Sequence, residues 1–197
     1  MAAPGLWDYS EWRGREAKPY GSADTYEIGV SWLDETCASI EDWGGALTYA
    51  KRYVRNASYY AIDGSPSAAE WCDEIQDLRE RHSSPDGVFM RHILEHNRDW
   101  AVILDNAVGS FRKRMVLVMF VPFSPFTHAT QNWEILDQSF ARQDLVDHFA
   151  PFLHHEQTLE TDTQYRWEHV FFLEKPQEEG SHDQPGVSDS TGQGTAG

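Results

Sequence analysis

The chain contains few cysteines and few basic residues, and each shortage argues against a class of protein. Only two cysteines, Cys37 and Cys72, occur in 197 residues, and neither belongs to a Cys-x-x-Cys pair or a cysteine–histidine spacing. A disulfide framework and a cysteine zinc site are therefore not indicated, and the reducing cytosol is the expected compartment. The net charge of -16, from 16 basic and 32 acidic residues, disfavours nucleic acid as a partner.

Long hydrophobic segments are absent too. The longest apolar run, residues 115–123, is far shorter than the roughly 18 to 20 residues that cross a bilayer, and the N-terminal stretch has no apolar leader. We therefore expect a soluble cytoplasmic protein without membrane contact. The sequence also lacks a G-x-S-x-G nucleophile elbow and a G-x-x-x-x-G-K-[ST] phosphate loop, which argues against two common enzyme chemistries.

Composition divides the chain into three parts. Residues 1–35 are expected to form an N-terminal segment and a first helix packed on the core, and residues 36–175 a single domain. Residues 176–197 are rich in Gly, Ser, Gln and Pro, with acids and no Lys or Arg. Such a stretch buries too little apolar surface to offset its ordering entropy, so we expect a disordered acidic tail.

Between the two ends, apolar runs of strand length alternate with amphipathic stretches of helix length. Helices are predicted over 24–35, 46–55, 100–111 after an Asn97 or Asp99 cap, and 144–152. Strands are predicted from Cys37 to Asp42 and over 58–63, 72–78, 86–93, 115–121, 154–160 and 167–175. This alternation indicates an α/β fold that is Rossmann-like and doubly wound, with a mostly parallel sheet and helices on both faces. The last two strands follow each other without a helix, so they should form an antiparallel hairpin.

Three acids stand at the ends of three successive predicted strands. Asp42 closes the first strand just before Gly44 and Gly45, Asp63 closes the second, and Asp77 follows the third. Ligands of such sheets bind beyond the carboxyl ends of the strands, where a carboxylate can accept both hydroxyls of a ribose. Taken singly, an Asp before Gly is more often a turn residue. The repetition at three strand ends favours a nucleoside site.

Several stretches resemble motifs of class I S-adenosylmethionine-dependent methyltransferases. The resemblance covers roughly residues 36–175 and is carried by IEDWGGALTYA, YYAIDGS, GVFMRHILEHNRDW, VLVMFVPF and TDTQYRWEHVFFLEK. The pattern RH-x-LEHN-x-D-W is most similar to small members of that family. No N-P-P-Y-like loop follows the fourth strand, which argues against the DNA amino-methyltransferases.

The resemblance implies S-adenosyl-L-methionine as cofactor, and we expect an unidentified methyl acceptor that is a small molecule rather than nucleic acid. The implied cofactor residues are Asp42, Gly44 and Gly45 at the methionine portion, Asp63 at the ribose, Asp77 with the Leu78 backbone at the adenine, and Met90 and Arg91 on the other side. The acceptor pocket would come from residues 1–35 and 124–140. The chain departs from the family pattern acid-x-G-x-G-x-G at Ala46 and Thr48, where glycines are usual.

The segment His92-Ile93-Leu94-Glu95-His96 admits two interpretations. It matches the H-x-x-E-H zinc signature, which requires both histidines on one face of one helix. Here His92 directly follows an apolar strand and the next helix begins after Asn97, so we predict a strand-end site without metal. If methyl transfer needs a base, His92 is the first choice and His96 or Glu95 the second, because a histidine pKa suits proton removal near neutral pH.

Three functions stay open on this basis. The favoured one is a methyltransferase. The second is a non-catalytic binding module of the same fold, with a cofactor site weakened at Ala46 and Thr48. The third is a zinc-dependent hydrolase built on residues 92–96.

Overall fold

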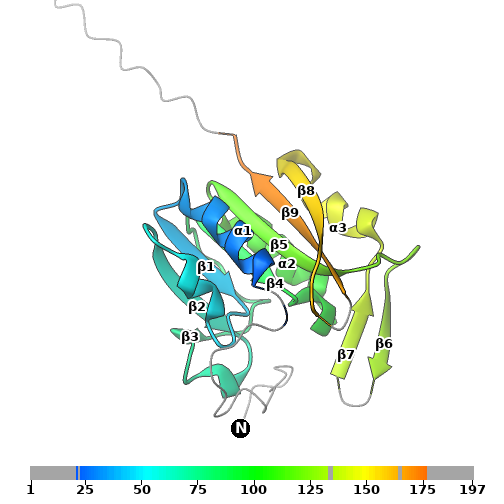
Figure 1. Ribbon diagram of the computed structural model, residues 1–197. Helices are drawn as coiled ribbons and strands as arrows, with labels where there is room; N and C mark the ends of the chain where they lie inside the picture. The colour runs from blue at the N-terminus through cyan, green and yellow to red at the C-terminus, as the bar shows by residue number, and fades with distance from the viewer. Residues whose placement is uncertain (1–20, 22, 133–134, 164–165, 177–197) are drawn as a thin grey trace, which may run out of the picture.

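The computed structural model describes residues 21, 23–132, 135–163 and 166–176 (Figure 1). The aromatic-rich start of the chain and the predicted acidic tail beyond residue 176 lie outside these residues. No helix in the described ranges is long and apolar enough to cross a membrane.

A seven-stranded sheet with the order β3-β2-β1-β4-β5-β9-β8 forms the centre of the protein (Figure 1). Its strands are β1 (Ser39–Trp43), β2 (Ser58–Asp63), β3 (Glu74–Ile75), β4 (Gly87–Arg91), β5 (Arg114–Val121), β8 (Leu153–Glu160) and β9 (Trp167–Glu174). The first five strands are parallel, whereas β9 runs antiparallel to both β5 and β8. The predicted Rossmann-like sheet with its antiparallel C-terminal hairpin is confirmed.

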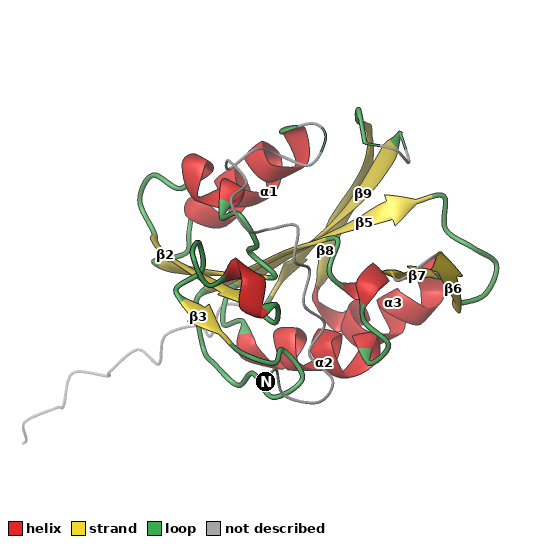
Figure 2. Ribbon diagram, turned by 90° about the horizontal axis from the view of Figure 1, so that it is seen from below, coloured by secondary structure: helices red, strands yellow, loops and turns green. Residues whose placement is uncertain are grey.

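Helices cover both faces of this sheet. Helix α1 (Asp24–Asp34) lies on one face, and α2 (Trp100–Ser110) and α3 (Arg142–Phe149) lie on the other (Figure 2). Alternate strand residues therefore point into two separate cores, one including Ile40, Phe89 and Val116, the other Trp43, Met90 and Leu117. Because the central strands are buried on both sides, they appear in the sequence as continuous apolar runs.

The helix predicted over 46–55 is wrong. The structure has only a 3-10 helix there, η2 (Tyr49–Tyr53), because Ala46 and Thr48 have φ values of 41° and 53° in the left-handed region. A regular α-helix cannot pass through such residues. The end of the connection is fixed as well, since Asp34 of α1 accepts hydrogen bonds from three consecutive backbone N–H groups just before β2.

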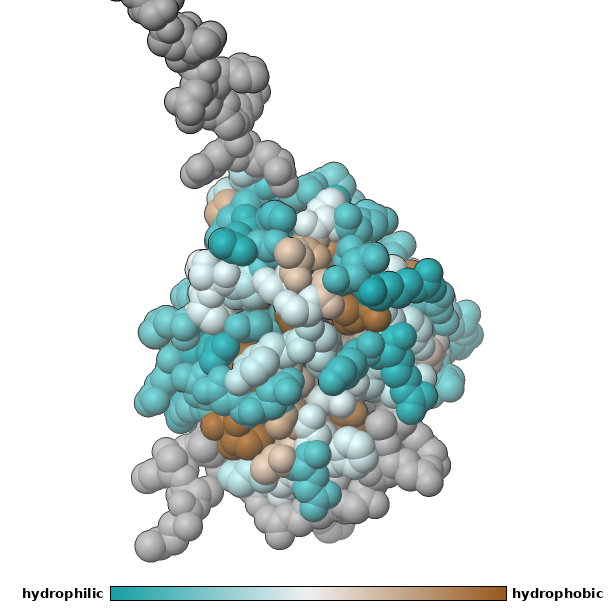
Figure 3. All heavy atoms as spheres, turned by 90° about the vertical axis from the view of Figure 1, so that its left-hand side faces the viewer, coloured by the Kyte–Doolittle hydropathy of each residue, from teal (hydrophilic) through white to brown (hydrophobic). Residues whose placement is uncertain are grey.

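Two further differences concern the strand over 72–78 and the region after β5. The predicted strand shrinks to the two residues of β3 at one edge of the sheet. The left-hand side of Figure 1 carries mainly hydrophilic residues with hydrophobic patches among them (Figure 3). After β5 the chain forms a separate hairpin, β6 (His128–Asn132) and β7 (Ile135–Ser139), where no strand was predicted. The hairpin projects from the body beside α3 (Figure 1). Its polar sequence has no apolar run that would have revealed it.

Candidate functional site

The carboxyl ends of β1 and β2 bring two buried acids together. Asp42 is 4% exposed and Asp63 is 8% exposed. The Tyr59 hydroxyl donates a short hydrogen bond to Oδ2 of Asp42. Asp63 accepts backbone N–H groups on both oxygens, from Ala46 at 3.0 Å and from Ser65 at 2.7 Å. Two of the three predicted acids therefore share one buried location.

Burial makes both of these carboxyl groups weak acids. Burial raises the pKa of Asp42 to about 7. The hydrogen bond from Tyr59 acts to lower this pKa, whereas the neighbouring charge of Asp63 acts to raise it. Burial likewise raises the pKa of Asp63 to about 6, although its two backbone hydrogen bonds oppose the shift. Within the described part of the chain, neither carboxylate forms an ion pair, although the charge of Arg91 acts to lower the pKa of Asp42.

The turn after β1 is built so that only glycine fits at its start. The N–H groups of Gly44 and Gly45 both donate to the carbonyl of Ile62, at 2.7 and 3.0 Å, which ties the turn to β2. Gly44 has a φ of 76°, and a Cβ atom there would lie 1.8 Å from Cδ1 of Ile93. The side chain of Ile93 thus packs directly on this turn. The predicted Gly44 and Gly45 are placed beside Asp42 and Asp63.

Asp77, the third predicted acid, follows β3 and has a cationic partner. Arg79 donates to it from the backbone N–H, from Nε and from Nη2, the last at 2.6 Å. These side-chain hydrogen bonds hold the pKa of Asp77 below its ordinary value. Arg79 also reaches Asp99 at 2.8 Å, just before α2. Leu78 is buried, and its carbonyl accepts a hydrogen bond from Asn106 at 3.2 Å. Asp77 is thus joined through Arg79 to Asp99, the residue before α2.

Arg91, at the end of β4, takes part in a buried polar cluster. Its guanidinium donates to Oε1 of Glu168 on β9 at 2.7 Å, to Thr25 at 3.1 Å and to Tyr26 at 3.1 Å. Thr25 in turn donates to the other oxygen of Glu168 at 2.6 Å. This cluster joins α1, β4 and β9. Met90, predicted with Arg91 at the cofactor, is fully buried in the core on the opposite face.

His92 lies at the edge of the same cluster. Its backbone is left-handed, with a φ of 55°, and its ring stacks on Phe120 at a centroid distance of 3.6 Å. Nε2 is 3.4 Å from Oε1 of Glu168. Burial and the nearby charge of Arg91 hold the pKa of His92 well below its ordinary value. His92 is therefore neutral at neutral pH and a poor proton acceptor.

Glu95 and His96 lie in the short 3-10 helix η4 (Leu94–His96) that follows. Oε1 of Glu95 accepts the backbone N–H of Phe120 at 2.9 Å, and burial raises the pKa of Glu95 to about 7. Nδ1 of His96 is 3.4 Å from Oδ1 of Asp137 on β7. His92 and His96 do not share a helix, and the described residues contain no group of three that could hold a metal ion. The H-x-x-E-H zinc interpretation therefore lacks structural support.

Several residues of this region were missed in the sequence. Tyr59 could have been found from strand alternation, because it pairs with Ile40 and so faces the same side of the sheet as Asp42. Arg79 and Arg81 sit in a connection without regular structure, where no periodicity marks them. Asp137 belongs to the hairpin that was not predicted.

No protein-family profile matches the chain, and no curated protein matches its sequence. Solved structures do match. The 1,6-didemethyltoxoflavin-N1-methyltransferase of Burkholderia thailandensis, with bound S-adenosylhomocysteine, is 16% identical with a TM-score of 0.61, over 78% of this chain and 77% of that one. The magnesium protoporphyrin IX methyltransferase of Synechocystis, also with bound S-adenosylhomocysteine, is 16% identical with a TM-score of 0.56, over 78% and 83%. The N-methyltransferase NodS of Bradyrhizobium japonicum is 11% identical with a TM-score of 0.53, over 75% and 83%. At these identities the likeness establishes the fold: this chain has the Rossmann-like architecture of these methyltransferases.

Proposed function

We propose that the protein is a methyltransferase that uses S-adenosylmethionine to methylate a small molecule. The observation that carries the proposal is the pair of buried acids, Asp42 and Asp63, at adjacent strand ends. Burying two carboxylates that form no ion pair with the described residues is unfavourable for the fold alone, as their raised pKa values indicate. A ligand with hydroxyl groups and a positive charge would add hydrogen bonds and an opposite charge to those that Tyr59, Arg91 and the backbone already supply.

The order of the strands supports one orientation of the cofactor. The sheet order β3-β2-β1 places Asp77, Asp63 and Asp42 at successive strand ends. We assign Asp42 with Gly44 and Gly45 to the methionine portion, Asp63 to the ribose hydroxyls, and Asp77 with Leu78 to the adenine. Carboxylates are suitable acceptors for hydroxyl, ammonium and amino groups, and glycines let a ligand approach the backbone, so the residue types fit. Arg91 and Met90 would support this site from the end of β4.

When bound, S-adenosylmethionine supplies a methyl group activated by the sulfonium. The residues of this chain then need to orient the acceptor, exclude water and, for a protonated acceptor, take up its proton. Glu95, with a pKa of about 7, is suited to accept a proton near neutral pH. His96 is partly exposed beside Asp137 and is the second candidate. The lowered pKa of His92 makes it the weakest of the three predicted bases.

Two observations favour a small acceptor over nucleic acid. The net charge of -16 opposes the approach of a phosphate backbone. The named structural neighbours include enzymes for toxoflavin and porphyrin precursors, which are small molecules. The hairpin of β6 and β7 and the loop before it, with the exposed Phe126, are our proposed acceptor side.

Three observations favour a second candidate, a non-catalytic module of the same fold. Ile93 already packs on Gly44, and both oxygens of Asp63 already accept backbone N–H groups. Together with Thr48 in place of a glycine, these contacts would weaken cofactor binding without disturbing the fold.

Calorimetric titration with S-adenosylmethionine separates the two candidates. The enzyme proposal predicts saturable binding that is weakened strongly in Asp63→Ala and is unchanged in Asp105→Ala, an exposed acid on α2. Absence of heat at millimolar cofactor would favour the module. If binding is found, transfer of a labelled methyl group from the cofactor into fractionated metabolites identifies the acceptor.

A further inference from the structure

The segment 76–83 carries Asp77 and Leu78 but contains no helix or strand. It belongs to the connection between β3 and β4, two parallel strands that a helix would ordinarily join. One backbone hydrogen bond, from the N–H of Gln76 to the carbonyl of Asp63 at 3.0 Å, ties the start of the segment to β2. Beyond it the segment has no backbone ladder, so its side chains contribute to where Asp77 and Leu78 lie.

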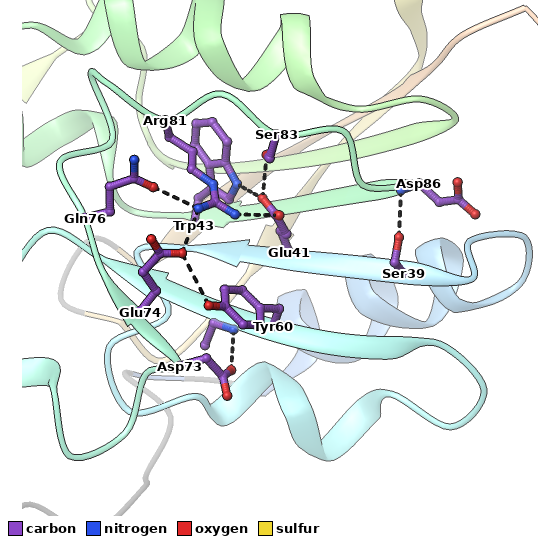
Figure 4. A network of polar contacts seen from close by, with 11 residues as sticks. Ser39, Glu41, Trp43, Tyr60, Asp73, Glu74, Gln76, Arg81, Ser83 and Asp86 are labelled. Carbon is purple, nitrogen blue, oxygen red and sulfur yellow. Dashed lines mark hydrogen bonds and ion pairs between the residues drawn. The ribbon is translucent and has the colours of Figure 1, made fainter.

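Arg81 fixes the segment to the sheet. Its Nη2 binds Oε1 of Glu41 on β1 at 2.8 Å, and its Nη1 binds both Oε2 of Glu74 on β3 and Oε1 of Gln76, each at 2.8 Å (Figure 4). Ser83 donates to the second oxygen of Glu41 at 2.7 Å. Arg81 and Glu41 are only 13% and 12% exposed, so this ion pair is poorly screened by solvent.

The same network reaches the proposed methionine end of the site. The indole N–H of Trp43 donates to Oε2 of Glu41 at 2.9 Å (Figure 4). Glu41 and Trp43 flank Asp42 in β1, and Trp43 itself is fully buried. The carboxylate of Glu41 thus receives hydrogen bonds from β1, from Arg81 and from Ser83. It links the irregular segment to the strand that carries Asp42.

A second set of contacts holds the segment against α2. Arg79 bridges Asp77 and Asp99, and the Asn106 amide donates to the carbonyls of Leu78 at 3.2 Å and Arg79 at 2.7 Å. These contacts lie directly at Asp77 and Leu78, whereas those of Arg81 lie on the sheet side. The segment is therefore held from two directions.

We infer that Arg81 is a positioning residue for the adenine end of the adenosyl site. This inference rests on the proposed function. A segment that is already ordered binds a flat base more tightly than a mobile one, because binding then costs less conformational entropy. Arg81 holds the segment that carries Asp77 and Leu78, so its loss should weaken the contact with adenine more than the contacts with ribose and homocysteine.

The test compares two ligands that differ in the base. S-adenosylhomocysteine and S-ribosylhomocysteine, which lacks adenine, are titrated calorimetrically into the wild type, Arg81→Gln and Arg81→Lys. We expect the affinity for S-adenosylhomocysteine to fall about tenfold in Arg81→Gln, with that for S-ribosylhomocysteine changed less than about twofold. Arg142→Gln is the matched control, because Arg142 pairs with Glu156 at 2.5 Å away from this segment, and both affinities should stay at wild-type values.

The outcomes separate this inference from the proposed function. If Arg81→Gln binds S-adenosylhomocysteine normally, or if both ligands weaken equally, the positioning role is wrong. If neither ligand binds the wild type, the proposed function fails and the inference with it. Should Arg81→Gln not fold, Arg81→Lys keeps the charge but cannot reach Glu41, Glu74 and Gln76 together, and it should show the same selective loss. Hydrogen exchange in the ligand-free protein gives an independent measurement. We expect residues 76–83 to exchange faster in Arg81→Lys than in the wild type, and β4 to exchange at the wild-type rate. The inference would be overturned if the exchange rates of the two segments changed equally or not at all.

Discussion

Two buried acidic regions of this protein differ in how their charge is compensated. Glu168, fully buried on β9, is bound by Arg91 and Thr25, which satisfy both its oxygens. Asp42 and Asp63, buried to a similar degree at the ends of β1 and β2, have hydrogen bonds but no ion pair within the described residues. In the first arrangement the buried charge has its counter-ion and donors within the chain. For the second, we propose that a ligand supplies further donors and charge.

The largest effect on stability is expected when the counter-ion of the buried Arg91 is removed. Glu168→Gln leaves Arg91 buried at 8% exposure without its counter-ion, and it should lower the free energy of unfolding by about 3 kcal/mol. Urea denaturation followed by circular dichroism measures this change. An effect below about 1 kcal/mol would mean that the two regions do not differ in the way described.

Asp42→Asn should have the opposite effect on stability. The pKa of Asp42 is raised from 3.8 to about 7 in the folded protein. Its contribution to stability is therefore fully present below the pKa of the unfolded chain and is lost as the pH rises through the pKa of the folded protein. At about pH 8 the substitution removes a buried charge and should raise the free energy of unfolding by about 2 kcal/mol. It should also weaken binding of S-adenosylhomocysteine about a hundredfold. Denaturation and calorimetry on one preparation test both, and lower stability at pH 8 would refute the assignment.

Gly44→Ala tests the packing between the turn and Ile93. The positive φ and the collision with Cδ1 of Ile93 should together lower the free energy of unfolding by about 2 kcal/mol or more. The double variant Gly44→Ala with Ile93→Ala removes the collision and leaves the backbone strain, so it should recover part of the loss relative to the sum of the single changes. Strictly additive effects in thermal or urea denaturation would show that the two residues are not in contact.

Ligand binding should depend on pH through the same two acids. Binding favours the ionised carboxylates, so protons held by Asp42 and Asp63 below their pKa values of about 7 and about 6 must be released. We expect the affinity for S-adenosylhomocysteine to fall about tenfold from about pH 8 to about pH 6. Titrations in buffers of different ionisation enthalpy should show proton release. An affinity that does not change over this interval would remove the link between the acids and the ligand.

The sequence predicted the sheet well because its signals are local. The apolar runs of β4 and β5 reflect strands that are buried on both faces. The acids at 42 and 63 mark the ends of their strands. It failed at residues 46–55, where the left-handed Ala46 and Thr48 replace a helix by a 3-10 turn, since few residues other than glycine signal such a conformation. The contacts of Arg91 and Arg81 join segments distant in the chain, and no pattern in one sequence shows such pairings.

The carboxyl pKa values of Asp42 and Asp63, measured by carbon-detected NMR with and without S-adenosylhomocysteine, test the central claim most directly. We predict values near 7 and near 6 in the ligand-free protein, and a fall of both on saturation with the ligand. Ordinary values for both groups in the free protein, or raised values that do not change at saturation, would contradict it.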